Sequence, residues 1–181
     1  KRQVRDCLRG RLSRDKIKGF SIPFNPRLLR IVGCGTAYNA GLLARYYIEQ
    51  LSKIPVILDH AHEFRYGAPS GPKSLVIGIS QSGETADTLA AIDAAQERGY
   101  PTLGIVNVES STIARNVDSL LGIRAGPEIG VASTKAFTGQ VLGGLLVAMK
   151  LGQLSKTFHR EDLSYFDRHA RMLPTSLSLI H

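Results

Sequence analysis

The stretch SLVIGISQSGET, residues 74–85, decides the fold and directs the search for a functional site. The apolar run at 74–79 does not alternate with polar residues, which is typical of a parallel strand buried on both faces. The residues after it have helical spacing from about Glu84 to Arg98, and Gly99 is a natural helix end. The stretch therefore predicts a buried strand, a polar turn and a helix.

The turn at 80–85 has the composition of an anion-binding site. It offers three hydroxyls, an amide and a glycine at the start of a helix, where backbone N–H groups lack partners. The same residue types are ordinary in turns and caps, so a polar turn without a ligand is the alternative. Glu84 is expected in the first helical turn, where a carboxylate suits the helix dipole, as a cap whose side chain turns away from an anion.

The alternation of strand and helix continues on both sides of this stretch. Strands are expected at 28–32, 55–58, 102–106 and 119–123, and helices at 38–51, 112–116 and 131–151, with a short helix or loop at 61–66. This order predicts an α/β fold, the flavodoxin-like three-layer α/β/α sandwich with a five-stranded parallel sheet. Ligands of such folds bind at the carboxyl ends of the strands, so the turns at 33–37 and 80–85 and the loop at 126–133 should meet there.

The two ends of the chain depart from this pattern. Residues 1–26 are expected to form an N-terminal helix and linker arm, with helical spacing over 3–13 followed by a break. Residues 27–155 would form the domain, and 156–181 a C-terminal helix interrupted by Pro174. With 181 residues, of which 43% are apolar, the chain is long enough for one domain with a full core.

Composition narrows the location and the partners. No apolar run approaches the length of a bilayer span, and the first residues lack the hydrophobic segment of a secretory signal, so we expect a cytoplasmic protein without membrane contact. The net charge of +8 favours an anionic partner, either nucleic acid, an acidic protein or a phosphorylated metabolite. The basic N-terminal segment lacks interleaved aromatic residues and the chain has no recognition motif, so no nucleic-acid partner is expected.

Several residues that suggest cofactors have simpler interpretations. Gly33-Cys34-Gly35 begins like a dinucleotide fingerprint, but Tyr38 stands where the third glycine is needed, so no nicotinamide cofactor is expected. His60 and His62 have no matching cysteine or carboxylate set, so no metal is expected. Cys7 and Cys34 have no redox or metal spacing and should be free thiols.

Two charged residues near the start of the last apolar helix leave alternatives open. Lys135 could reach the ligand crevice, or be an exposed lysine at a helix start, and Glu128 has the same ambiguity. Acid–base chemistry requires a group within hydrogen-bond reach of its proton, and the sequence does not give that distance.

Four motifs together carry a family resemblance. They are GCGTAY at 33–38, EFRY at 63–66, SQSGETADT at 80–88 and EIGVASTKAFT at 128–138. In this order they resemble the sugar isomerase (SIS) family, over about residues 8–154, and are most similar to the first SIS half of aminotransferases that make glucosamine 6-phosphate from fructose 6-phosphate and glutamine. One of these motifs alone would be far less specific than the set.

The resemblance implies a ligand and the residues that bind it. The ligand would be fructose 6-phosphate or glucosamine 6-phosphate, bound without a metal or organic cofactor in a homodimer. By similarity, the substrate-binding residues would be Gly35, Thr36, Ala37, Ser80, Gln81, Ser82, Thr85, Val131, Ala132 and Ser133. Those of the 80–85 turn would hold the phosphate. Ala37 stands where the family often has serine, so one hydroxyl contact would be lost.

The resemblance also implies what the chain lacks. Family members of this kind have an N-terminal glutaminase domain and a second SIS half that supplies the lysine, glutamate and histidine of isomerisation. None of these motifs occurs in the sequence, so we expect a fragment without catalytic residues that binds sugar phosphate but does not complete aminotransfer. The alternative is a stand-alone or regulatory SIS module that senses a phosphosugar, although the motif at 128–138 favours the aminotransferase.

Overall fold

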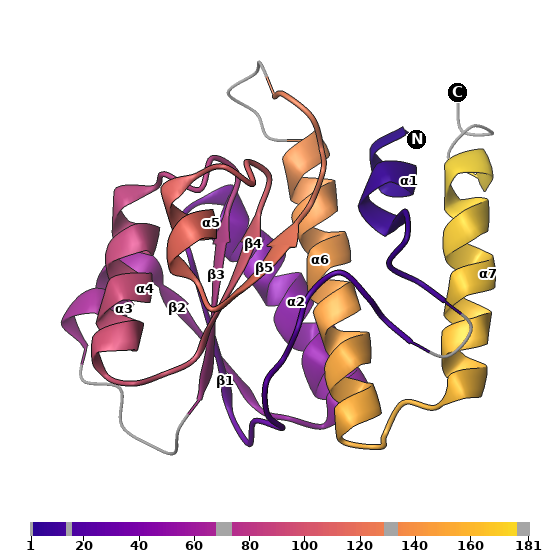
Figure 1. Cartoon of the computed structure of the whole chain (residues 1–181), viewed down its shortest axis with the longest axis horizontal. Coiled ribbons are helices and arrows are strands. Elements are labelled where there is room, and N and C mark those ends of the chain that lie inside the picture. The colour runs from indigo at the N-terminus through magenta and orange to yellow at the C-terminus, as the bar shows by residue number, and fades with distance from the viewer. Residues whose placement is uncertain (1, 14–15, 68–73, 129–133, 177–181) are drawn as a thin grey trace.

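The chain forms a five-stranded sheet in which every strand pair is parallel. The computed structural model describes residues 2–13, 16–67, 74–128 and 134–176. Its strands are β1 Leu29–Gly33, β2 Val56–His60, β3 Leu75–Ser80, β4 Thr102–Val106 and β5 Ser119–Gly122. They lie in the order β2-β1-β3-β4-β5 (Figure 1). From β1 the chain adds β2 on one side of the sheet and then β3, β4 and β5 on the other side. The topological switch point therefore lies between β1 and β3. The predicted flavodoxin-like sheet is confirmed.

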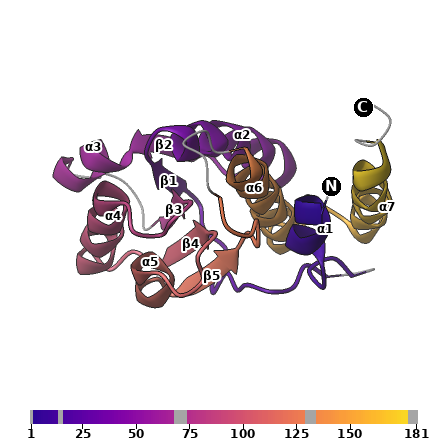
Figure 2. The same cartoon turned by 90° about the horizontal axis from the view of Figure 1, so that it is seen from above.

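Helices cover both faces of the sheet. The helices that do so are α2 Thr36–Ser52, α3 Ala61–Tyr66, α4 Ala86–Glu97, α5 Thr112–Asn116 and α6 Lys135–Leu154. Figure 2 shows α2 and α6 on one face and α3, α4 and α5 on the other. Alternate strand residues point to the two layers, since Ile31 and Ile77 pack in the cluster of α2 and α6, whereas Val32 and Val76 pack in that of α3 and α4. The three-layer sandwich is thus confirmed.

Glycines let α6 approach its neighbours closely. A Cβ atom at Gly144 would lie 3.0 Å from the Cα of Ala44 on α2, and one at Gly143 would lie 2.9 Å from Ile105 Cγ2 on β4. Both distances are shorter than ordinary carbon contacts, so larger residues would force the elements apart. This packing fixes α6 against the sheet and against α2.

Two further helices lie outside α6. They are α1 Arg2–Leu8 and α7 Arg160–Ser176, which flank the side of α6 that faces away from the sheet (Figure 2). Val4 and Cys7 of α1 pack with Leu142 of α6. Ile17 and Ile22, farther along the same segment, belong to the main core cluster. Residues of the expected N-terminal arm thus contribute to the core, and the domain boundaries expected at 27 and 155 stay a prediction.

Several expected helix limits were wrong. The first helix ends at Leu8 and not at residue 13, because Gly10 has φ +72° and Leu12 bridges to Ile17 in an antiparallel pair. The helix after β3 begins at Ala86 and not at Glu84. Helix α7 continues through Pro174 to Ser176, since a proline so close to a helix end removes only one of its last backbone bonds.

Among the described residues, no helix is both long and apolar enough to cross a membrane.

Candidate functional site

A pocket of about 260 Å³ opens where β1 and β3 end. Its lining comes from the segments after β1, after β3 and around the start of α6: Cys34, Thr36, Ala37, Ile79, Ser80, Gln81, Ser82, Thr85, Glu128 and Gln140. The structure thus brings together six of the expected site residues, on the turns at 33–37 and 80–85. Gly35 lies directly before α2 at this pocket. Val131, Ala132 and Ser133 fall outside the described residues.

The 80–85 turn is held by its own hydroxyls. Ser80 Oγ accepts a hydrogen bond from the Gly83 N–H at 3.0 Å and lies 3.0 Å from Thr85 Oγ1, and its residue is only 2% exposed. Ser82 Oγ accepts from the Glu84 N–H at 3.1 Å. A hydroxyl that accepts one hydrogen bond can still donate its own hydrogen. The Ser82 hydroxyl can therefore accept the hydrogen bond that stabilises the turn and donate one to an anion at the same time.

Glu84 does not cap the helix that follows it, which corrects the sequence-based expectation. The helix begins two residues later, and Glu84 Oε1 accepts a hydrogen bond from the Thr112 N–H at 2.8 Å. Bonding to the Thr112 N–H and hydroxyl holds the pKa of the Glu84 carboxyl below its usual range. The carboxylate therefore binds the N-terminus of α5, not that of α4. Glycine is required beside it, because a Cβ at Gly83 would overlap Ser111 Oγ.

Helices α2 and α4 begin beside the pocket without side-chain caps. Thr85 precedes α4 and Gly35, with φ 54°, precedes α2, and neither makes a side-chain cap hydrogen bond. The first N–H groups of any helix have no partner within the helix and carry the positive end of its dipole. Two such ends meet at this pocket from opposite faces of the sheet, which makes it suited to an anion.

The N-terminus of α6 is occupied by a residue of the chain itself. Glu128 accepts three backbone hydrogen bonds there, from Thr134 and Lys135 through Oε1 at 2.9 and 3.0 Å and from Ala136 through Oε2 at 2.9 Å. Lys135 Nζ donates to the Pro127 carbonyl at 2.9 Å. Both residues thus make structural contacts at the start of α6, and Glu128 also lines the pocket, so both alternatives left by the sequence remain open for it.

Gln140 is a pocket residue that sequence reasoning missed. It lies on α6 and is 1% exposed, and its Oε1 atom has no hydrogen-bond partner among the described residues. The polarity of Gln140 could have identified it, because the other buried residues of α6, such as Ala136, Gly143 and Val147, are apolar or glycine. One polar residue on such a face is an exception that asks for a reason.

The cysteines and two of the histidines make contacts within the described part of the chain. Cys7 and Cys34 are free thiols, as expected, and burial raises the pKa of the Cys7 thiol. Cys34 Sγ lies 3.8 Å from Thr88 Oγ1. His60 stacks between Tyr38 and His62, with ring centroids 3.9 and 5.5 Å apart. In the described part of the chain no group of three or more His, Cys, Asp or Glu side chains suits a metal ion.

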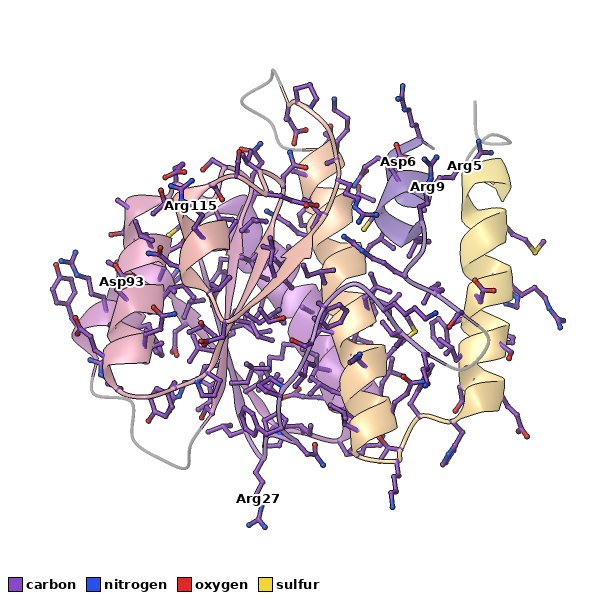
Figure 3. All side chains as sticks on the ribbon, viewed as in Figure 1. Arg5, Asp6, Arg9, Arg27, Asp93 and Arg115 are labelled. Carbon is purple, nitrogen blue, oxygen red and sulfur yellow. The ribbon has the colours of Figure 1, made fainter. Side chains whose placement is uncertain are left out.

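Part of the basic N-terminal segment lies on α1, and its arginines do not line the pocket. Figure 3 shows Arg5, Asp6 and Arg9 on α1, and Arg27 at the opposite edge of the sheet from the carboxyl ends of the strands. Asp6 pairs with Arg9 at 3.2 Å, so part of this charge is neutralised locally. These arginines are thus not part of the pocket.

Comparisons with known proteins place this geometry in a family. The SIS domain profile matches residues 25–150. The glutamine–fructose-6-phosphate aminotransferase [isomerizing] of Pseudomonas putida is 43% identical over 96% of this chain and 30% of its own length, and that of Chlamydia caviae is 50% identical over 84% of this chain and 25% of its own length. The chain therefore spans less than a third of these relatives.

Solved structures agree. The C-terminal domain of glucosamine-fructose-6-phosphate aminotransferase from Francisella tularensis superposes with a TM-score of 0.78 at 36% identity, covering 81% of this chain and 42% of that chain. A glucosamine-6-phosphate deaminase from Thermotoga maritima superposes with a TM-score of 0.64 at 28% identity, covering 72% of this chain and 43% of that chain. With its profile match, its parallel sheet and its pocket at the switch point, this chain belongs to the SIS domain family.

Proposed function

We propose that this chain is the sugar-phosphate-binding SIS half of an isomerizing glutamine–fructose-6-phosphate aminotransferase. Its ligand would be fructose 6-phosphate or glucosamine 6-phosphate, and the whole enzyme would be a cytoplasmic homodimer. Relatives of that name at 43% and 50% identity support this choice within the SIS family. The chain spans at most 30% of their length, so the glutaminase and isomerisation steps are assigned to other parts of the protein.

One observation carries the proposed binding role. Near the carboxyl edge of the sheet, backbone N–H groups at the N-termini of α5 and α6 donate to the carboxylates of Glu84 and Glu128, whereas the N-termini of α2 and α4 have no side-chain cap. A phosphate placed between the uncapped ends would receive backbone N–H groups and the Ser82 hydroxyl. Thr36, Ser80, Gln81 and Thr85 would complete its surroundings.

The sugar would extend from the phosphate toward the start of α6. We assign its contacts by similarity to Val131, Ala132 and Ser133. Gly35 and Ala37 contribute backbone at the near side of the pocket, where the Gly35 conformation allows close approach of a ligand. No residue of this chain is assigned to proton transfer.

Calorimetric titration tests the proposal. The parent chain should bind fructose 6-phosphate far more tightly than fructose, because the phosphate carries the interaction. Ser82→Ala should weaken fructose 6-phosphate binding by about 1.5–3 kcal/mol, the usual contribution of a hydrogen bond to a charged group. Ser110→Ala, an exposed serine outside the pocket lining, is the control and should bind as the parent does. Equal affinity for both sugars would refute the site.

A second measurement tests whether the glutaminase and isomerisation steps belong to other parts of the protein. The isolated chain, given fructose 6-phosphate and glutamine, should form no glucosamine 6-phosphate. Detection of that product would show that the isomerisation groups are present here and would overturn the assignment.

A further inference from the structure

Gln140 has an amide oxygen for which the described residues offer no donor. The residue is 1% exposed, and its Oε1 atom is without a partner in the part of the chain that the structure describes. Native proteins pair the great majority of their buried polar groups, because leaving one unpaired is costly. Since Gln140 lines the pocket, a group that enters the pocket is the natural source of the missing donor.

The chemistry of the acceptor selects the part of the ligand that it can bind. The phosphate group of a sugar phosphate, as a monoester dianion, accepts hydrogen bonds and has no hydrogen to donate, so it cannot satisfy an amide oxygen. A sugar hydroxyl can donate. Ser82 and the N-terminus of α4 provide donors on one side of the pocket, while Gln140, whose Oε1 atom has no donor among the described residues, lines the pocket from α6. The two sides are therefore complementary to the two ends of a sugar phosphate.

The support of Gln140 is rigid. It lies one turn before Gly143 and Gly144, where α6 is in close contact with Ile105 and Ala44. At the start of the same helix, Glu128 holds the backbone of Thr134, Lys135 and Ala136. Because the backbone that carries Gln140 is held in place, less conformational entropy is lost when a ligand binds there, which favours affinity.

We propose that Gln140 is a specificity-determining residue that accepts a hydrogen bond from a hydroxyl group of the sugar. The inference rests on the proposed sugar-phosphate function and adds the group that distinguishes a sugar phosphate from phosphate alone. No resemblance or motif assigned this role to Gln140.

Titration of matched variants tests the proposal. Gln140→Met keeps the length and shape of the side chain without polar atoms, and Gln153→Met, on the same helix but outside the pocket lining, is the control. The probes are fructose 6-phosphate and methyl phosphate, whose dianion, like that of a sugar phosphate, carries no hydrogen on its phosphate group. Gln140→Met should bind fructose 6-phosphate about tenfold more weakly than the parent, as expected for loss of one hydrogen bond, and methyl phosphate equally well. Gln153→Met should match the parent with both probes.

Each outcome of these titrations supports or overturns the proposed role of Gln140. Unchanged binding of fructose 6-phosphate by Gln140→Met overturns the inference, since water would then satisfy the amide. Equal weakening of both probes means that the amide contacts phosphate and overturns the assignment to a hydroxyl. If the parent itself fails to bind fructose 6-phosphate, the proposed function falls and this inference with it. Circular dichroism verifies folding, and Gln140→Leu replaces the methionine variant if that variant does not fold.

Discussion

The hydroxyl of Ser80 should matter more for stability than any other hydroxyl of the 80–85 turn. Its Oγ accepts the Gly83 N–H and lies within hydrogen-bond distance of Thr85 Oγ1, in a residue that is 2% exposed. Ser80→Ala would leave the buried Gly83 N–H without this acceptor, which costs about 1–3 kcal/mol, and would remove a further bond of about 1 kcal/mol. We expect a total loss of about 2–4 kcal/mol.

Ser82→Ala is the matched control within the same turn. Ser82 Oγ also accepts a backbone hydrogen bond, but the donor, the Glu84 N–H, is on an exposed residue where water can replace the hydroxyl. Its loss should cost no more than about 0.5 kcal/mol, as surface substitutions usually do. The two variants remove the same atom from the same residue type, and they differ in burial.

Urea unfolding followed by circular dichroism measures both losses. The dependence of the free energy on urea should be the same for the parent and the variants, so that midpoint shifts report stability alone. For a domain of this size the melting temperature of Ser80→Ala should fall by roughly 5–10 °C. If Ser80→Ala proves no less stable than Ser82→Ala, the turn is not held by the Ser80 hydroxyl and the reasoning is wrong.

Three further predictions concern the surroundings of this turn. Gly83→Ala should lower stability by about 2–3 kcal/mol in urea unfolding, because a Cβ would displace Ser111 and strain a backbone with positive φ; parent-like stability would contradict this. The pKa of Glu84 lies below its ordinary value of 4.5 in the folded chain, so its carboxylate stabilises the fold above that pH and this contribution is lost as the pH falls through the folded-state value. The difference in stability between parent and Glu84→Gln should therefore be largest at neutral pH and close in acid, and a gap that widens in acid would refute the Thr112 contact. Ala37→Ser, which adds a hydroxyl on the first turn of α2 in the pocket, should tighten fructose 6-phosphate binding about fivefold by calorimetry; unchanged affinity would argue against this placement.

Much of the fold could be predicted from local patterns. The strand at 102–106 and the helix at 112–116 have the predicted bounds, and the other strands shift by one or two residues at their ends. Unbroken apolar runs identify parallel strands because both faces are covered, and the strand order follows from right-handed crossovers. The turns after β1 and β3 then meet by topology alone, which is why the main part of the pocket could be predicted.

What the sequence did not show depends on contacts between distant residues. Glu84 has the spacing of a cap for its own helix, yet the N-terminus of α5, 28 residues away along the chain, binds its carboxylate. Gln140 lies on a helix that could have exposed it, and only the packing of α6 on the sheet buries it. The contacts of α1 with α6 are likewise long-range. The pairings of Glu84 and of α1 leave no periodic signal in the residues that make them, whereas Gln140 is marked as the polar exception among the buried residues of α6.

The positions of Glu84 and Glu128 distribute negative charge unevenly among the helix N-termini near the pocket. Each carboxylate binds a helix N-terminus at the carboxyl edge of the sheet, so negative charge already stands beside α5 and α6 while the starts of α2 and α4 carry none from a cap. A molecule with one phosphorylated end would therefore be turned phosphate first toward β1 and β3, with its uncharged end toward Glu128 and Gln140. Although the chain has a net charge of +8, two negative side chains would govern which end of such a molecule binds where.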